Sequence, residues 1–196
     1  LCTFLAIMIN FSVRYKKNNI LKFLSSFLTV GYAVPGIILA IGVMQLLTYI
    51  DASFIGKSIQ FLLTGSLIGL ILAYIIKSYA LASSAIESGY QRVNIRLDDV
   101  AKSLKSSGWS LLSSVHLPLL KTSFLTSVLL VISEVIKELP ATLILRPFNF
   151  DTLATQTYEF AIEEMIPLSS IYSLTIILIG SILLLILKNI INKQIN

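Results

Sequence analysis

At residues 137–154 the chain reads KELPATLILRPFNFDTLA, a short insert that combines charged residues, prolines and aromatics. Apolar runs flank the insert on both sides: 119–136, which carries Glu134, and 166–187, which has no charged residue. A plain membrane anchor needs no such insert. Polar side chains at a membrane border are energetically costly and are usually kept for a function. The insert therefore predicts that the distinctive chemistry of this protein lies at one surface of a membrane.

The composition is that of a membrane protein, because 56% of the residues are hydrophobic, only 13% are charged, and the mean hydropathy is +0.87. Four stretches, 27–50, 58–76, 119–136 and 166–187, approach the roughly 20 apolar residues that cross a bilayer. A fifth run, 1–13, is too short to cross alone. We interpret it as the end of a helix, so that the chain is the C-terminal portion of a longer polypeptide. The expected fold is an all-α membrane protein with a five-segment helical core.

The basic residues predict the orientation, because Lys and Arg accumulate in the cytoplasmic loops of membrane proteins. Twelve of the fifteen basic residues fall on one side of the five segments: Arg14, Lys16, Lys17, Lys22, Lys77, Arg92, Arg96, Lys102, Lys105, Lys121, Lys188 and Lys193. The opposite side holds Lys57, Lys137 and Arg146 together with six acidic residues, Asp51, Glu138, Asp151, Glu159, Glu163 and Glu164. Loop 78–118 and the C terminus are therefore predicted to be cytoplasmic, and loop 137–165 extracytoplasmic. The net charge of +5 follows from this topology and needs no nucleic-acid partner.

The second segment contains Pro35 and Gly36 in the middle of its apolar residues. Proline removes a backbone hydrogen-bond donor and bends a helix, and glycine lets helices approach closely. One interpretation is a pore helix that can bend. The other is ordinary helix packing, since both residues are common in membrane helices.

The cytoplasmic loop contains a short amphipathic helix over 96–105, with Leu97, Val100, Ala101 and Leu104 at helical spacing. Ser106, Ser107 and Gly108 interrupt it, and helical character resumes over 109–115. Two short helices beneath a helical bundle could fit a groove on a partner protein. Alternatively, they rest on lipid headgroups.

The chain shows little sign of enzyme chemistry. Cys2 is the only cysteine, so neither an intramolecular disulfide nor a cysteine metal cluster is possible. His116 is the only histidine, and we expect it at the membrane interface rather than as a metal ligand or as part of a hydrolase triad. No phosphate-binding loop of the G-x-x-x-x-G-K-[ST] type occurs, so any ATP would be hydrolysed by another subunit. The prediction is a protein that is not an enzyme and has no cofactor.

Two stretches of the loop, Asp99-Val100-Ala101 and Val115-His116-Leu117-Pro118, resemble the EAA loop of permease subunits of ABC importers. The family pattern is Glu-Ala-Ala, three residues, Gly, a variable stretch and Ile-x-Leu-Pro. Here Asp99 replaces the Glu, Val100 replaces an Ala, and Lys105 replaces the Gly. Because a residue with a β-carbon resists the positive φ available to glycine, we expect the helix break at 106–108 instead.

The insert itself is similar, almost without interruption, to a segment typical of ferric iron importer permeases, and residues 33–36 (AVPG) also fit that family. Such permeases are often one polypeptide with two homologous halves, of which this chain would be the second. The resemblance implies a plasma (inner) membrane permease of a bacterium. Its implied partners are an ATP-binding subunit, present as a dimer, an extracytoplasmic iron-binding protein and a second permease half.

The resemblance also implies two groups of functional residues. The ATPase-coupling group, in which Val100, Ala101 and Leu104 dock into the ATPase, comprises Asp99, Val100, Ala101, Leu104, Lys105, Gly108, Leu117 and Pro118. The group along the translocation path or its gate comprises Pro35, Gly36, Glu134, Glu138, Pro140 and Arg146.

Fe³⁺ prefers hard oxygen ligands, which the outer side offers in Glu134, Glu138, Asp151, Tyr158, Glu159, Glu163 and Glu164. Our hypothesis is that Glu134 or Glu138 lines the path or pairs with Lys137 or Arg146. For Glu159, Glu163 and Glu164 we favour a solvated surface that contacts the binding protein. No metal ligand set is assigned.

Other functions remain open from the sequence. A permease for thiamine, a polyamine or a phosphonate would share the cytoplasmic loop. A secondary transporter would also show broken helices and buried acidic residues, but it needs no docking loop. A membrane-embedded enzyme fits least, because no nucleophile with a base accompanies the carboxylates.

Overall fold

The computed structural model describes residues 1–16, 18–53, 63–106 and 108–195, and all regular elements in these ranges are helices. Lys17 and Lys57, which entered the charge argument, and the start of the predicted segment 58–76 lie outside the described residues. The elements are α1 (Cys2–Lys16), α2 (Asn19–Thr29), η1 (Val30–Ala33), α3 (Gly36–Ala52), α5 (Leu67–Arg92), α6 (Arg96–Ser103), α7 (Gly108–Leu111), η2 (Leu112–His116), α8 (Leu117–Leu119), α9 (Lys121–Ile136), α10 (Pro140–Leu145), α11 (Leu153–Ile162) and α12 (Ile166–Ile195).

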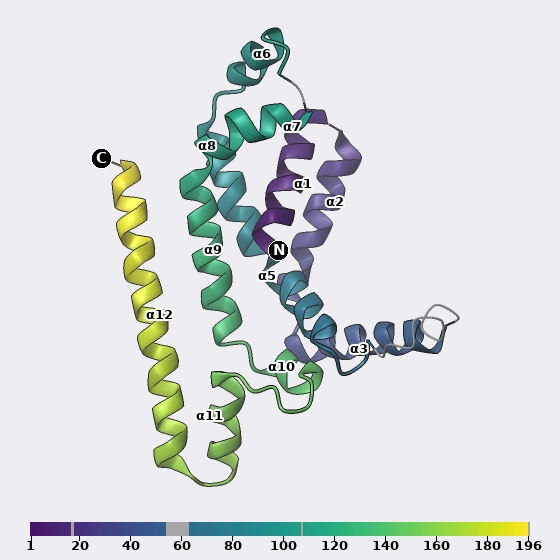
Figure 1. The fold of residues 1–196 in the computed structure, drawn as a ribbon, viewed down its shortest axis with the longest axis vertical. Coiled ribbons are helices and arrows are strands. Elements are labelled where there is room, and N and C mark those ends of the chain that lie inside the picture. Colours follow the sequence, from purple (N-terminus) through teal and green to yellow (C-terminus); the bar gives the residue numbers. More distant parts are fainter. Residues whose placement is uncertain (17, 54–62, 107, 196) are drawn as a thin grey trace.

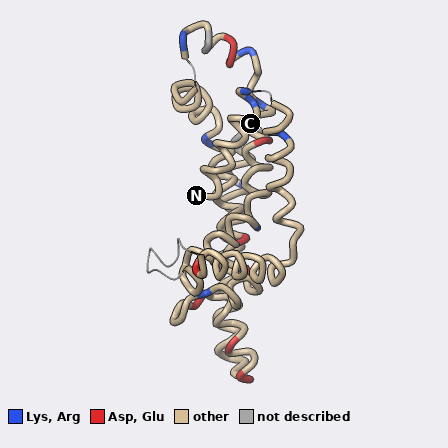
Figure 2. Tube along the Cα trace, turned by 90° about the vertical axis from the view of Figure 1, so that its right-hand side faces the viewer, with Lys and Arg blue, Asp and Glu red and all other residues tan. Residues whose placement is uncertain are grey.

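The long helices α1, α2, α5, α9 and α12 alternate in direction along the molecule (Figure 1). At one end α6 projects beyond the other helices, and the C-terminal end of α12 points toward the same end. The opposite end holds α10, α11 and the turn into α12. Basic residues gather at the α6 end and acidic residues at the α11–α12 end (Figure 2). The helix α3 (Gly36–Ala52), which holds most of the predicted second segment 27–50, instead runs across the other helices (Figure 1).

Within the described residues, two helices, α5 and α12, are long and apolar enough to cross a membrane, and two bent pairs raise the number of possible spans there to four. One pair joins Asn19–Ala33 to Gly36–Ala52 at 116°, and the other joins Gly108–Leu119 to Lys121–Ile136 at 77°. The expectation of an all-α membrane protein is confirmed. The predicted segment 27–50 is not one straight span, however, because the chain turns at Pro35, whose extended backbone separates η1 from α3.

The third predicted segment, 58–76, begins and ends earlier than the helix that the structure shows. Its helix, α5, begins at Leu67, after a turn in which the Ser66 side chain accepts a hydrogen bond from the Ile68 amide, and it continues to Arg92. Residues 78–92, expected in the cytoplasmic loop, are therefore helical. This region looked polar because it is rich in small residues such as Ser78, Ala82 and Ser83, yet these are buried between helices. Small residues favour close packing of membrane helices, which a hydropathy average does not register.

The central element is α5, which packs against α1, α2, α3, α9 and α10. Near the α6 end it shares an apolar core with α1, α7 and η2, to which Ile7, Ile86 and Leu111 belong. Near the other end it shares a second core with α3 and α10, built around Val43, Leu70 and Leu145. A single helix thus connects the two ends of the molecule where unusual residues gather.

Candidate functional site

A buried ion pair joins α5 to the segment between α9 and α10. The Lys77 ammonium, on α5, donates to the Glu138 carboxylate, which precedes α10. Glu138 is only 5% exposed. A charge so far from water is stable only when it is paired and hydrogen-bonded. We name this ion pair, with the start of α3 that covers it, the outer join.

Further hydrogen bonds fix the outer join. The second Glu138 oxygen, Oε1, accepts from the Ala141 amide at 3.2 Å, and the Thr142 hydroxyl donates to the Glu138 carbonyl at 2.6 Å. The Tyr74 and Thr142 hydroxyls are also bonded at 2.6 Å. These contacts tie the first turn of α10 to α5.

Gly36 begins α3 directly over the ion pair. A Cβ at this position would lie 2.8 Å from Glu138 Oε1, 3.2 Å from Lys77 Nζ and 3.2 Å from Pro140 Cβ. Glycine is therefore required by the close approach of α3 to the charged pair. The structure brings together four residues predicted for the path, Pro35, Gly36, Glu138 and Pro140.

One of the two glutamates has an expected partner. Glu134 pairs with Lys137 at 3.0 Å, whereas Glu138 pairs with Lys77, which the sequence did not suggest. Lys77, expected among the cytoplasmic basic residues, lies beside Glu138 instead. The available signal was a lysine inside an apolar run, since ionisable residues within membrane helices are rare and usually paired.

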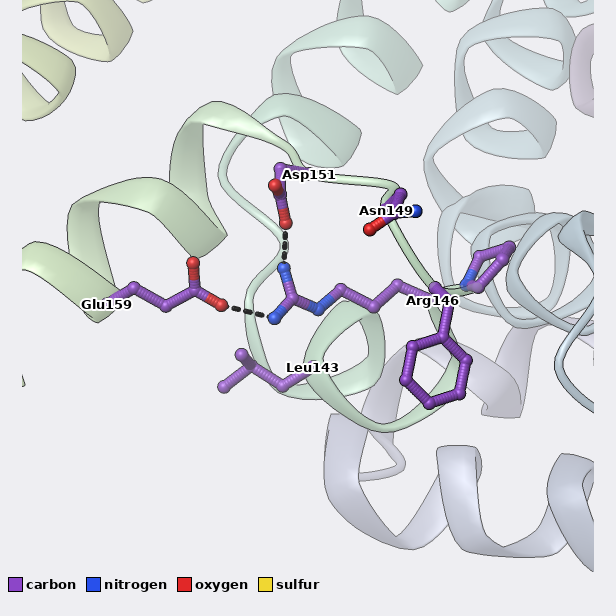
Figure 3. A pocket seen from close by; sticks show the side chains of 7 residues that line it. Leu143, Arg146, Asn149, Asp151 and Glu159 are labelled. Atoms are coloured by element: carbon purple, nitrogen blue, oxygen red, sulfur yellow. Dashed lines mark hydrogen bonds and ion pairs between the residues drawn. The ribbon is translucent and has the colours of Figure 1, made fainter.

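Arg146 does not contact the Lys77–Glu138 pair. Its guanidinium instead bridges Asp151 and Glu159 (Figure 3). Around this bridge is a pocket of about 360 Å³, lined by Leu143, Arg146, Pro147, Phe148, Asn149, Asp151 and Glu159. At its rim Asn149 adopts a positive φ of 59° in a tight turn, which asparagine tolerates, and Phe148 is fully exposed. The residues from 146 to 159 thus form a polar surface on which the ring of Phe148 is fully exposed.

The described acidic residues do not gather into a metal site: no group of three or more His, Cys, Asp or Glu in the described ranges could hold an ion. Four of the carboxylates considered for iron, on Glu134, Glu138, Asp151 and Glu159, instead pair with Lys or Arg. Glu163 and Glu164 are exposed at the end of α11.

At the other end of the molecule, α6 stops in a left-handed C-terminal turn. Lys105 has a φ of +62°, and the Ser106 amide donates to the Ala101 carbonyl at 3.0 Å, which is the closing bond of a Schellman motif. The helix break is therefore at Lys105, and the expectation that it would move to 106–108 is wrong. Lysine occupies the conformation that glycine would adopt without strain, and Gly108, the first residue of α7, also has a positive φ, of 53°.

Within α6 the buried and exposed faces are well separated. Asp98 and Ala101 are buried, whereas Val100 is 58% and Leu104 77% exposed. Leu97 and Asp99 are exposed as well. This corrects the expectation for Ala101, which packs into the core of its own subunit and cannot present its side chain to a partner.

The last two residues of the predicted coupling group, Leu117 and Pro118, lie after α6 and before α9. Leu117 and Pro118 form the short helix α8, which follows the π-helical turn η2. The chain then bends by 77° into α9. The Trp109 side chain in α7 is exposed as well.

Comparison with known proteins agrees with this geometry. The sequence profile of the family described as binding-protein-dependent transport system inner membrane component matches residues 3–196. PhnV of Salmonella typhimurium, described as a candidate 2-aminoethylphosphonate transport system permease protein, is 27% identical over 167 residues. That alignment covers 85% of this chain and 59% of the relative, and PhnV of Salmonella choleraesuis gives the same values.

A second kind of relative is the Fe(3+)-transport system permease protein FbpB 2 of Haemophilus influenzae. It is 22% identical over 157 residues, which are 80% of this chain and 29% of the relative. The chain thus spans about three fifths or less of the length of these relatives. Since the family profile covers nearly every residue, the chain belongs to the family of binding-protein-dependent transport system inner membrane components.

Proposed function

We propose that this chain is a permease subunit of an ATP-driven importer, which passes a small solute from an extracytoplasmic binding protein through the membrane. The observation that carries the proposal is α6, a short helix that projects from one end of the bundle with an apolar free face. An exposed apolar helix face at the end of a membrane domain is a docking surface for a groove on a partner. The partner is a separate ATPase subunit.

The docking face consists of Leu97, Val100 and Leu104, flanked by the Asp99 carboxylate. An apolar centre with a polar edge is the usual anatomy of a protein interface. Because Asp98 and Ala101 hold the opposite face of α6 to its own subunit, the helix presents one defined surface. In this arrangement α6 and the C terminus face the cytoplasm, and residues 137–165 face the outside.

On the outer side, the proposal gives two roles to the charged residues. The outer join, with Lys77, Glu138 and Gly36, belongs to the gate, because opening a path between α3, α5 and α10 requires this ion pair to separate or move. The Arg146 surface, with the protruding Phe148, receives the binding protein. A second permease half covers the apolar face of α3, where Ile38, Ile41 and Tyr49 are exposed.

Ferric iron and an organophosphonate are the two cargoes with support. The resemblance of the insert to ferric iron permeases and the similarity to FbpB 2 favour iron. The similarity to PhnV, at higher identity, favours a phosphonate. Uptake of radiolabelled ferric iron and of 2-aminoethylphosphonate by cells with and without this gene decides between them.

Crosslinking tests the docking proposal. In a background with Cys2→Ala, Leu104→Cys and Val100→Cys are expected to form crosslinks to a nucleotide-hydrolysing subunit in intact membranes. Ala101→Cys is the matched control, since it lies on the same helix but is buried. Equal capture at all three positions, or no ATPase captured at any of them, would contradict the proposal. A secondary transporter, which needs no ATPase, predicts the second result.

A further inference from the structure

The attachment of α6 to the rest of the subunit depends on Arg14, near the end of α1. The Arg14 guanidinium donates to both oxygens of Asp98, with Nε–Oδ2 at 2.8 Å and Nη2–Oδ1 at 3.1 Å. Asp98 lies in the first turn of α6. A two-point bond between arginine and a carboxylate fixes orientation as well as distance.

The same guanidinium also holds the end of α5. Nη1 donates to the Tyr90 carbonyl at 2.9 Å, and Nη2 donates to the carbonyls of Val93 at 3.1 Å and Asn94 at 3.3 Å. These carbonyls lie at the C-terminal end of a helix, where the macrodipole favours a positive charge. One side chain therefore connects α1, the last turn of α5 and the first turn of α6.

Aromatic rings enclose this connection. The Arg14 guanidinium lies 5.3 Å from the centre of the Tyr90 ring. His116, from η2, packs against Phe11 and Tyr90, and its Nε2 is 3.5 Å from Asp98 Oδ1. His116 is 1% exposed, and among the described residues neither of its ring nitrogens has a hydrogen-bond partner. His116, which was expected at the membrane interface, is therefore enclosed by side chains of its own subunit.

Removing two charges from water is costly, and well-packed apolar residues of similar volume often stabilise a protein at least as well. A buried pair that joins α1 and α6 at the end of α5 therefore points to a role other than stability. The helix that Arg14 holds, α5, also carries Lys77, roughly 20 Å further along its axis. Lys77 is paired with Glu138 in the outer join.

We infer that Arg14 and Asp98 are positioning residues for coupling. They make α6 and α5 move as one body, so that a displacement of α6 reaches the Lys77–Glu138 pair through α5. This inference rests on the proposed function, because it requires an ATPase that displaces α6. Neither residue touches the cargo or the nucleotide.

The test uses the permease purified with its ATPase subunit and reconstituted into lipid nanodiscs. All variants carry Cys2→Ala and the reporter Ala141→Cys, since Ala141 is buried beside the outer join and only its backbone amide bonds to Glu138. The measurement is the rate of maleimide labelling at position 141 with and without ATP and vanadate. In the otherwise unchanged protein, nucleotide is expected to change this rate.

The decisive variant is Arg14→Met with Asp98→Leu, which removes both charges and leaves no unpaired buried ion. The ATPase is expected to copurify with it as before, while the nucleotide-dependent change in labelling falls about tenfold or more. Glu87→Gln, an exposed site on α5, is the matched control and should keep the full change. If the double variant does not reach the membrane, Arg14→Lys replaces it, because an ammonium cannot span the carboxylate and three carbonyls together.

The outcomes separate the two proposals. The inference is overturned if nucleotide changes the labelling rate of the double variant, or of Arg14→Lys, as much as it changes that of the parent protein. It is also overturned if the parent protein copurifies with its ATPase but its labelling rate does not respond to nucleotide. Failure of the unvaried protein to copurify with any ATPase overturns the proposed function instead.

Discussion

At the scale of single residues, Lys105 holds a backbone conformation that suits glycine. A left-handed conformation costs an L-residue about 1–2 kcal/mol. We therefore expect Lys105→Gly to raise the unfolding free energy by about 1 kcal/mol, measured by thermal denaturation in detergent. Lys105→Ala removes the charge but keeps the β-carbon, and it should give no such gain. Equal effects of the two substitutions would show that the charge, rather than the backbone, matters.

The Lys77–Glu138 pair gives a second prediction at this scale. Lys77→Met leaves Glu138 buried without its partner, which should lower the unfolding free energy by about 3 kcal/mol. The double variant Lys77→Met with Glu138→Leu should regain most of this loss, because no unpaired charge remains. If the double variant loses as much unfolding free energy as the two single variants together, the two side chains do not stabilise each other.

The same pair can be tested for transport. Glu138→Gln is expected to reduce uptake of the cargo at unchanged membrane abundance, because the amide cannot replace the carboxylate opposite the Lys77 ammonium. Glu163→Gln, at an exposed acidic residue outside the outer join, is the control. Normal uptake by the Glu138 variant would remove this residue from the gate.

At the scale of elements, the fold depends on close contact between α5 and α9 at Gly89. A Cβ on Gly89 would lie 2.3 Å from Ser123 Oγ and 2.8 Å from Leu120 Cδ2. Gly89→Val should therefore push the helices apart and lower the unfolding free energy by about 1–3 kcal/mol. Gly180→Val in α12, where a Cβ meets open space, should have little effect. Similar melting temperatures for both variants would contradict this account of the α5–α9 contact.

At the scale of the whole molecule, the two polar ends should lie on opposite sides of the membrane. In a Cys2→Ala background, a membrane-impermeant maleimide should label Phe148→Cys in intact cells but label Leu104→Cys only after the membrane is opened. Both side chains are highly exposed, so access rather than burial sets the difference. Labelling of both positions in intact cells would reject the predicted topology.

The sequence by itself determined the class and the amphipathic character of α6, and it singled out Pro35 and Gly36 without deciding whether the chain breaks there. Apolar runs of spanning length, proline and helical spacing act locally along the chain, so they can be read without knowledge of the fold. The family resemblance likewise rested on continuous stretches of residues. The sequence did not determine the cargo, because neither the apolar segments nor the stretches that carry the family resemblance specify what passes between the helices.

Only the tertiary structure decided which charges meet and which side of each helix is free. Lys77 and Glu138 are separated by 61 residues, and Arg14 and Asp98 by 84, so no local pattern could pair them. The burial of Ala101 and His116, and the left-handed turn at Lys105, likewise depend on how α6 packs against α1 and α5. A buried charge is tolerated only where distant segments supply its partner, and that partner exists only once the helices have packed.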